Sequence, residues 1–141
     1  MTITVIGMPG PQGSKRFVGV SGGKGIMIES SALVKPWREA VKYAACFARQ
    51  KGDATPFVGP LRISITFTLP RPKSAPKSRK YPDRKPDLSK LVRSTEDALT
   101  DAGIWEDDAR VVSCHSTKVF PNGGVHALDV PGCVIFIESA S

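Results

Sequence analysis

Residues 71–86, RPKSAPKSRKYPDRKP, divide the chain into two parts and do not suit a packed helix or strand. The segment contains four prolines, and each proline removes a backbone N–H that a helix or sheet would use. Seven of its residues are lysine or arginine and one is acidic, so few apolar side chains are available to bury. The sequence therefore predicts a basic, mobile loop at 71–86 between two structured parts.

The segments on either side of this loop are periodic. Residues 61–69, LRISITFTL, place an apolar side chain at every second position, which predicts a half-buried strand. Residues 87–101 have the helical period, with Asp87 as a suitable N-cap. The expected core stripe of this helix is Leu88, Leu91, Val92, Thr95 and Leu99.

Shorter patterns predict the remaining elements. We expect a strand at 2–7, a hairpin formed by 17–20 and 25–29, and a helix at 31–51 with Pro36 in its first turn. A strand at 111–120 should lead through a turn at 121–124 to a returning strand at 125–130 or 133–137. These elements predict one α+β domain over residues 1–141, with a mixed or mostly antiparallel sheet and two main helices.

Composition narrows the classes of protein to consider. No stretch approaches 18 apolar residues and the N-terminus lacks a signal-peptide plan, so we expect a cytoplasmic protein without a membrane partner. Cys46, Cys114 and Cys133 lack metal-ligand spacing, and we expect reduced thiols that mostly fill the core. The net charge of +7 favours a polyanionic partner, nucleic acid first, although it could serve solubility alone.

Charge is divided unevenly in the second half of the chain. The basic loop is followed by residues 87–108, which carry seven acidic residues and two basic ones. Nucleases need such a pairing, because cations hold the phosphate backbone and clustered carboxylates hold Mg²⁺ or Mn²⁺ at the scissile phosphate. The alternative is structural: Asp87 would only cap a helix, and the acidic residues 101–108 would only form a solvated turn.

Residues 85–112, KPDLSKLVRSTEDALTDAGIWEDDARVV, resemble the signature of the RusA family of Holliday junction resolvases. In that family an Asp-x-Asp pair opens a helix, a basic residue follows one turn later, and an Asp-Asp pair ends the motif. GMPGPQGSKR at 7–16 and KPWREAV at 35–41 are also similar to phage-type members. The resemblance implies a structure-selective endodeoxyribonuclease that resolves four-way junctions by Mg²⁺-dependent paired cuts in recombination and repair, with Mn²⁺ able to substitute.

The resemblance also assigns residues by position. Asp87 matches the first catalytic aspartate, and Asp107 and Asp108 match the terminal pair, with Asp108 the better catalytic candidate. Arg93 matches the helical basic residue, normally lysine, and its guanidinium suits phosphate contact but not proton transfer. Ser89 stands where the family has its second aspartate, and a hydroxyl is a weaker Mg²⁺ ligand than a carboxylate.

The serine at position 89, in place of the family's aspartate, could have three consequences. Ser89 could hold a metal-bound water, another acid such as Glu96 could replace it, or activity could be impaired. An impaired protein would bind junctions without cutting them. A general nucleic-acid-binding module, whose acidic residues only cap a helix, is a further alternative.

Several other residues are assigned by their chemistry. Trp105 is expected to be a core or interface residue, with stacking on an unpaired base as the alternative. His115, inside a predicted strand, is expected to be structural. The candidate DNA-binding residues are Lys15, Arg16, Arg71, Lys73, Lys77, Arg79, Lys80, Arg84 and Lys85.

A homodimer on branched double-stranded DNA is implied by the resemblance, and helix length gives a separate reason to expect one. A helix over 87–101 would separate its ends by roughly 21 Å, while two ligands of one Mg²⁺ must both lie about 2.0–2.1 Å from it. We therefore expect a site shared between protomers, with Asp87 of one chain near Asp108 of the other. A compact turn at residues 102–103 that builds each site within one chain is the alternative.

Overall fold

One four-stranded sheet and two long helices make up the described part of the protein. The computed structural model describes residues 1–13, 23–52 and 56–141, and of residues 23–31 it describes the backbone alone. The elements in chain order are β1 (Thr2–Ile6), α1 (Gly23–Lys51), β2 (Leu61–Thr68), α2 (Leu88–Asp101), the short 3-10 helix η1 (Asp108–Arg110), β3 (Val111–Val119) and β4 (Gly132–Ser139).

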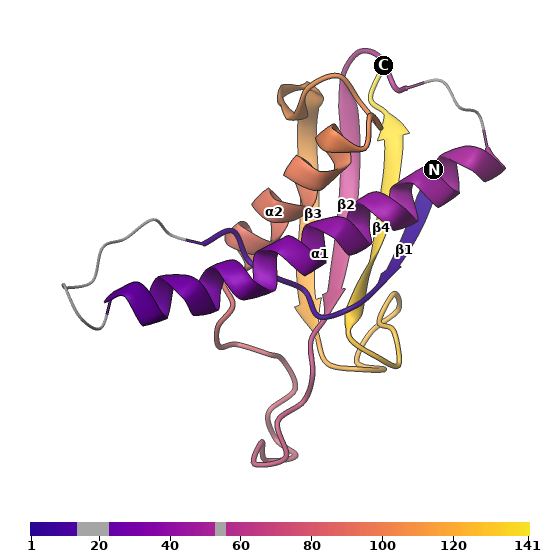
Figure 1. Ribbon diagram of the computed structural model, residues 1–141. Helices are drawn as coiled ribbons and strands as arrows, with labels where there is room; N and C mark the ends of the chain where they lie inside the picture. Colours follow the sequence, from indigo (N-terminus) through magenta and orange to yellow (C-terminus); the bar gives the residue numbers. More distant parts are fainter. Residues whose placement is uncertain (14–22, 53–55) are drawn as a thin grey trace.

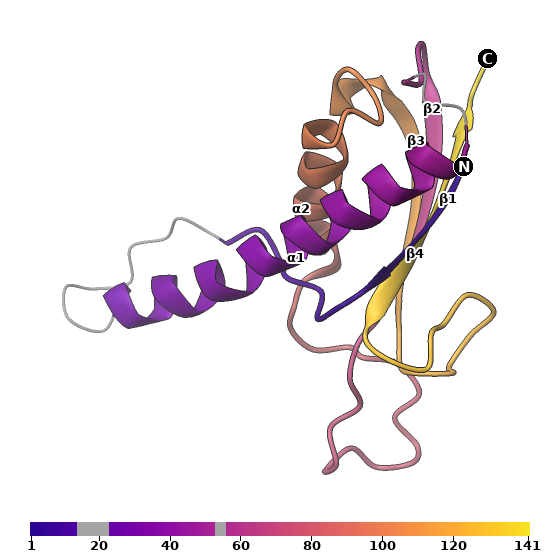
Figure 2. The ribbon, with the colours of Figure 1, turned by 45° about the vertical axis from the view of Figure 1, so that its right-hand side comes forward.

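The sheet is mixed, with the strand order β1-β4-β2-β3. Strands β2 and β3 are parallel, while β4 lies between β1 and β2 and is antiparallel to both. Both helices lie on the same face of the sheet, with α2 over the β3 side and α1 crossing diagonally towards β1 (Figures 1 and 2). The predicted single-domain α+β fold with two main helices is confirmed.

The core lies between the sheet and the two helices. On β2, Leu61, Ile63, Ile65 and Phe67 are all buried, which confirms the alternation predicted for this strand. On α2 the predicted stripe is also confirmed, since Leu91, Thr95 and Leu99 are buried and the other two members pack against the core. Burial of these apolar side chains supplies most of the free energy that holds the helices on the sheet.

A hydrogen bond between buried side chains joins the two helices. The indole Nε1 of Trp37 on α1 donates to Thr95 Oγ1 on α2 at 3.1 Å, and Thr95 Oγ1 donates in turn to Leu91 O at 2.7 Å. Both side chains are almost fully buried, so neither could replace its partner with water.

The start of α1 differs from the sequence prediction. The backbone is helical from Gly23, so residues 25–29 are not a strand, and residues 17–20, the other half of the expected hairpin, lie outside the described residues. Pro36 consequently lies inside the helix rather than in its first turn. The apolar run at 26–28 was too short a pattern to distinguish a strand from the beginning of a long helix.

The connection after β3 also differs. Residues 121–124 do turn, with Asn122 at φ 58°, and the chain returns within β4, which confirms the predicted alternative at 133–137 and not the one at 125–130. The returning strand, however, pairs with β1 and β2 and not with β3. A turn sequence specifies only that the chain reverses; here the segment crosses the end of β2 before it joins the sheet (Figure 1).

The cysteines only partly follow the prediction. All three are free thiols, and Cys133 is buried in β4, but Cys46 and Cys114 are exposed and do not fill the core. None of the described helices is both long and apolar enough to cross a membrane.

We expect Thr95→Val to destabilise the protein by about 1–3 kcal/mol, because it leaves a buried indole N–H without an acceptor. Urea unfolding followed by circular dichroism measures this loss. The same substitution in a Trp37→Phe background should cost clearly less, since no donor is then stranded. Equal losses in the two backgrounds would show that the hydrogen bond between the helices contributes nothing.

Candidate functional site

Asp107 and Asp108 lie in the short connection between α2 and β3. Gly103, at φ 74°, ends the helical segment, and Trp105 anchors the connection in the core. The indole N–H of Trp105 donates to Thr100 Oγ1 at 2.7 Å, and its backbone forms a bridge to Phe57. Because its side chain is buried, Trp105 is a core residue, as predicted, and it is not placed to stack on a base.

The two aspartates influence each other's protonation. The Asp107 carboxylate accepts a hydrogen bond from Ala109 N at 2.9 Å, which lowers the pKa of Asp107. A hydrogen bond to Asp107, followed by partial desolvation and nearby negative charge, raises the pKa of Asp108. A cation beside these carboxyl groups would offset the negative charge that contributes to the raised pKa of Asp108.

Glu96 on α2 belongs to the same acidic group. Burial, together with the smaller effects of the charges of Asp108 and Asp97, raises its pKa to about 7. The Cys114 thiol on β3 lies close enough for the charge of Glu96 to raise its pKa, although burial is the larger cause. The acidic cluster, defined as Glu96, Asp97, Asp107 and Asp108, therefore lies where the last turns of α2 meet the beginning of β3.

Asp87 lies at the opposite end of α2. It occupies the N-cap position, as predicted, but its side chain accepts no hydrogen bond from the helix backbone. Its nearest ionic partner is Lys90 Nζ, at 3.7 Å. Ser89 and Arg93, on the following turns, are exposed. The Asp87 carboxylate is thus not used as a helix cap and remains open to solvent.

Lys118 supports the backbone next to Asp87, and no sequence motif pointed to it. Its Nζ donates to Arg84 O and to Pro86 O, both at 2.9 Å. Lys118 pairs with Phe67 across the β2–β3 ladder, so it extends from the face of the sheet that carries the helices. A lysine at an inward position of the strand pattern was the signal that could have indicated this contact.

The N-terminal loop also reaches the Asp87 end of α2. Ser94 Oγ donates to Gly10 O at 2.6 Å, and Gln12 N donates to Lys90 O at 3.0 Å. Gly10 is required for this packing, since a Cβ atom there would lie 2.1 Å from Leu33 O. Lys15 and Arg16, the candidate DNA contacts in this loop, lie outside the described residues.

The basic loop at 71–86 contains no helix or strand, as predicted, and it extends beyond the end of the sheet (Figure 1). Two of its arginines organise the loop. Arg71 donates to Pro76 O at 2.7 Å and to Arg79 O at 2.9 Å, Arg79 pairs with Asp83 at 3.0 Å, and both guanidinium groups lie over the Phe120 ring. The other cations are exposed: Lys73, Lys77, Lys80, Arg84 and Lys85.

The length of α2 separates the predicted site residues into two groups. With 14 residues, the helix spans about 21 Å, with Asp87 before its first turn, while Asp108 lies near Glu96 and Asp97 in the second half of the helix. The structure therefore brings Glu96, Asp107 and Asp108 together but leaves Asp87 apart. Within one protomer, no group of three His, Cys, Asp or Glu side chains among the described residues is placed to hold a metal ion.

Comparison with known proteins identifies the family. The model of the endodeoxyribonuclease RusA family matches residues 7–127, a stretch that includes α1, β2, α2 and β3. The uncharacterized protein YqaN of Bacillus subtilis (strain 168) is 30% identical over 127 residues, which cover 83% of this chain and 85% of that relative. The chain belongs to the RusA family of endodeoxyribonucleases.

Proposed function

We propose that this protein is a structure-selective endonuclease that resolves four-way DNA junctions by Mg²⁺-dependent, paired phosphodiester hydrolysis in recombination and repair. The observation that carries the proposal is the presence, in a chain of this family, of exposed aspartates at both ends of α2, the residues that the resemblance assigns to the catalytic motif. The absence of a side-chain cap at Asp87 argues against the view that its carboxylate only ends a helix.

The residues present fit a hard divalent cation. All the candidate ligands are oxygen atoms, and nearby negative charge, which a cation would offset, contributes to the raised pKa values of both Glu96 and Asp108. A bound Mg²⁺ would polarise the phosphoryl oxygen and lower the pKa of a coordinated water. In this proposal Asp87, Asp107, Asp108 and Glu96 hold the ion, with Mn²⁺ able to substitute for it, and Arg93 contacts a phosphate oxygen with its planar guanidinium.

We propose further that a homodimer assembles each site from two chains. An antiparallel two-fold pairing of α2 helices would bring Asp87 of one protomer to the acidic cluster of its partner. Strand β3 supports this arrangement, because it pairs only with β2 among the described strands and its residues 112–115 are exposed. Val112 in particular is 66% exposed on this edge. Such a dimer would match the approximate two-fold symmetry of a junction.

Ser89 gives a specific reason to keep a second candidate function. It occupies the position of a family aspartate, and its exposed hydroxyl cannot supply the same charge. Glu96 can compensate only if its carboxylate reaches the shared ion. Otherwise the protein would bind junctions without cutting them.

The proposal is tested by incubating the purified protein with a synthetic four-way junction. We expect paired nicks with Mg²⁺ or Mn²⁺ and none with EDTA, and little cleavage of linear duplex. Asp87→Asn and Asp108→Asn should each lower the nicking rate about 100-fold or more while junction binding persists. Tight binding without any cleavage would favour the impaired protein, and equal affinity for linear and branched DNA would favour a general nucleic-acid-binding module.

The basic loop should contact the DNA backbone mainly through its exposed lysines. Replacing Lys73, Lys77 and Lys80 with Gln should flatten the dependence of log affinity on log salt by roughly 0.9 for each phosphate contact that is lost. A matched control replaces three lysines of α1: Lys35, Lys42 and Lys51. If the control flattens the slope as much as the loop variant, DNA does not follow the loop preferentially.

A separate variant tests how the loop is held. Phe120→Leu keeps every cation but removes the ring beneath Arg71 and Arg79. We expect it to weaken junction binding less than the triple lysine substitution, with an unchanged salt slope, because the phosphate contacts remain.

We expect Glu96→Gln to raise the Mg²⁺ concentration needed for half-maximal nicking by about tenfold, because it removes a ligand. Adding Ser89→Asp in the same chain should restore the Mg²⁺ dependence. Asp97→Asn is the matched control, since it also removes a negative charge near Asp108 but no proposed ligand. The compensation idea fails if Glu96→Gln behaves like Asp97→Asn.

A further inference from the structure

Among the described strands, β1 pairs only with β4, so its other edge has no partner strand there and lies on the side of the sheet opposite to β3. Met1 and Ile137 exchange backbone hydrogen bonds of 2.8 and 2.9 Å, and Gly7 N donates to Pro131 O at 3.1 Å. Because paired residues alternate along an antiparallel ladder, Ile3 and Val5 also direct their backbone groups towards β4. The N–H and C=O groups of Thr2, Thr4 and Ile6 therefore point outward, where they could bond a further strand.

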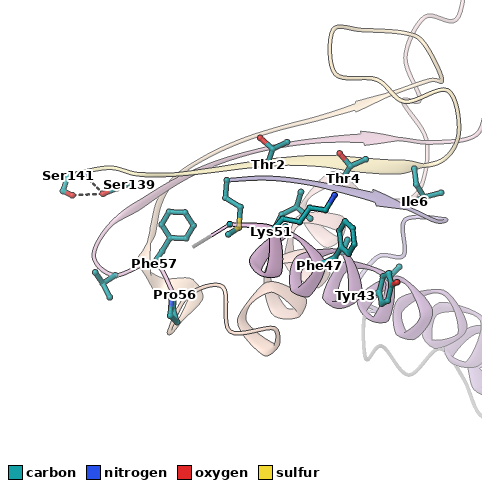
Figure 3. A pocket seen from close by; sticks show the side chains of 17 residues that line it. Thr2, Thr4, Ile6, Tyr43, Phe47, Lys51, Pro56, Phe57, Ser139 and Ser141 are labelled. Carbon is teal, nitrogen blue, oxygen red and sulfur yellow. Dashed lines mark hydrogen bonds between the residues drawn. The ribbon is translucent and has the colours of Figure 1, made fainter. Parts of the chain in front are cut away.

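An apolar groove of about 1220 Å³ runs beside this edge (Figure 3). Its walls are β1, the second half of α1, which contributes Tyr43 and Phe47, and the segment before β2, which contributes Phe57 and Val58. Four of the ten exposed large hydrophobic side chains in the described residues line this groove: Ile6, Tyr43, Phe47 and Val58. Exposed apolar side chains gathered in this way mark an interaction surface.

Charge at the groove indicates the chemistry of its occupant. Lys51 is the one charged side chain among the described residues that line it, and its Nζ lies 4.7 Å from the centre of the Phe47 ring. An acidic side chain beside Lys51 would complement this charge next to an apolar contact.

A second copy of this chain is a poor candidate for the occupant. The dimer proposed above uses α2 and β3, at the other edge of the sheet. A second two-fold interface through β1 would link dimers into an open filament unless the two axes met. This exclusion rests on the proposed function.

We propose that β1 and its groove bind an extended, acidic and apolar segment of another protein. The segment adds a fifth strand through the free backbone groups of Thr2, Thr4 and Ile6. Its alternate side chains pack against Tyr43 and Phe47, and an acidic side chain pairs with Lys51. Because this surface lies on the edge away from α2, a partner protein and DNA can be bound together, so that the nuclease is brought to its place of action.

Selection of a displayed library of random ten-residue peptides on the full-length protein provides the probe. We expect the selected peptides to carry apolar residues at alternate positions and at least one acidic residue. A selected peptide, synthesised with a fluorophore, is then titrated against variants by fluorescence anisotropy in the absence of DNA.

The decisive variant is Thr4→Pro, which removes one outward N–H without touching the bonds to β4. It should weaken peptide binding at least about tenfold, as should Phe47→Ser, whereas Thr4→Val keeps the N–H and should bind normally. Circular dichroism and junction nicking should be unchanged in all three. Since binding is read without DNA, a wild-type protein that failed to nick junctions would leave this result standing.

Two results would overturn the proposal. One is a library that yields no peptide whose binding depends on Thr4 and Phe47. The other is a change of assembly state: if sedimentation shows that Thr4→Pro breaks a larger oligomer of the wild-type protein, the edge of β1 pairs with a second copy instead.

Discussion

The packing of α2 against the sheet fixes the distance between the acidic residues of this protein. In the chain, α2 connects β2 to β3, and these two strands are parallel. The helix must therefore carry the chain from one end of the sheet back to the other, and its own ends lie at opposite ends of the sheet. The indole N–H of Trp37 on α1 donates a hydrogen bond to α2, and the indole N–H of Trp105 donates one from the connection after α2 back to the helix. Since the helix cannot shorten, Glu96, the cluster member on α2 that is nearest in sequence, stays about 14 Å along the helix axis from Asp87 in one chain.

This separation gives each end of α2 a different electrostatic character. At one end, burial raises the pKa of Glu96 and a hydrogen bond with Asp107 raises the pKa of Asp108, and like charges nearby add to both effects. At the other end, Asp87 lies beside the basic loop and the backbone that Lys118 holds. A two-fold pairing would place the cations of one protomer next to the acidic cluster of the other, which is the combination that phosphodiester hydrolysis requires.

Local patterns predicted the elements around the site, whereas tertiary contacts determined the rest. The alternation of β2 and the stripe of α2 span enough residues to be read from the sequence, and both are confirmed. The order of the strands depends on contacts between distant segments, so a turn after β3 could not reveal that β4 pairs elsewhere. The first turns of α1 showed a pattern too short to decide between strand and helix.

At the candidate site too, the sequence predicted which residues matter, while tertiary contacts determined how they are arranged. The motif located Asp87, Asp107 and Asp108, but their separation follows from how α2 packs, and the missing cap at Asp87 is a matter of side-chain geometry. The grouping of Glu96 with Asp108, and the contact of Lys118 with residues 84–86, depend on the α2–β3 packing and have no signature in the sequence.

The shared site is the central claim, and mixed dimers test it most directly. An Asp87→Asn chain is refolded with an Asp108→Asn chain, and the mixed dimer is isolated with two different affinity tags. If each site draws on both chains, one site of this dimer is intact and the other carries both substitutions, so we expect nicking of one strand at about half the wild-type rate. If each site lies within one chain, every site carries one substitution, and verified mixed dimers without any recovered nicking would contradict the account.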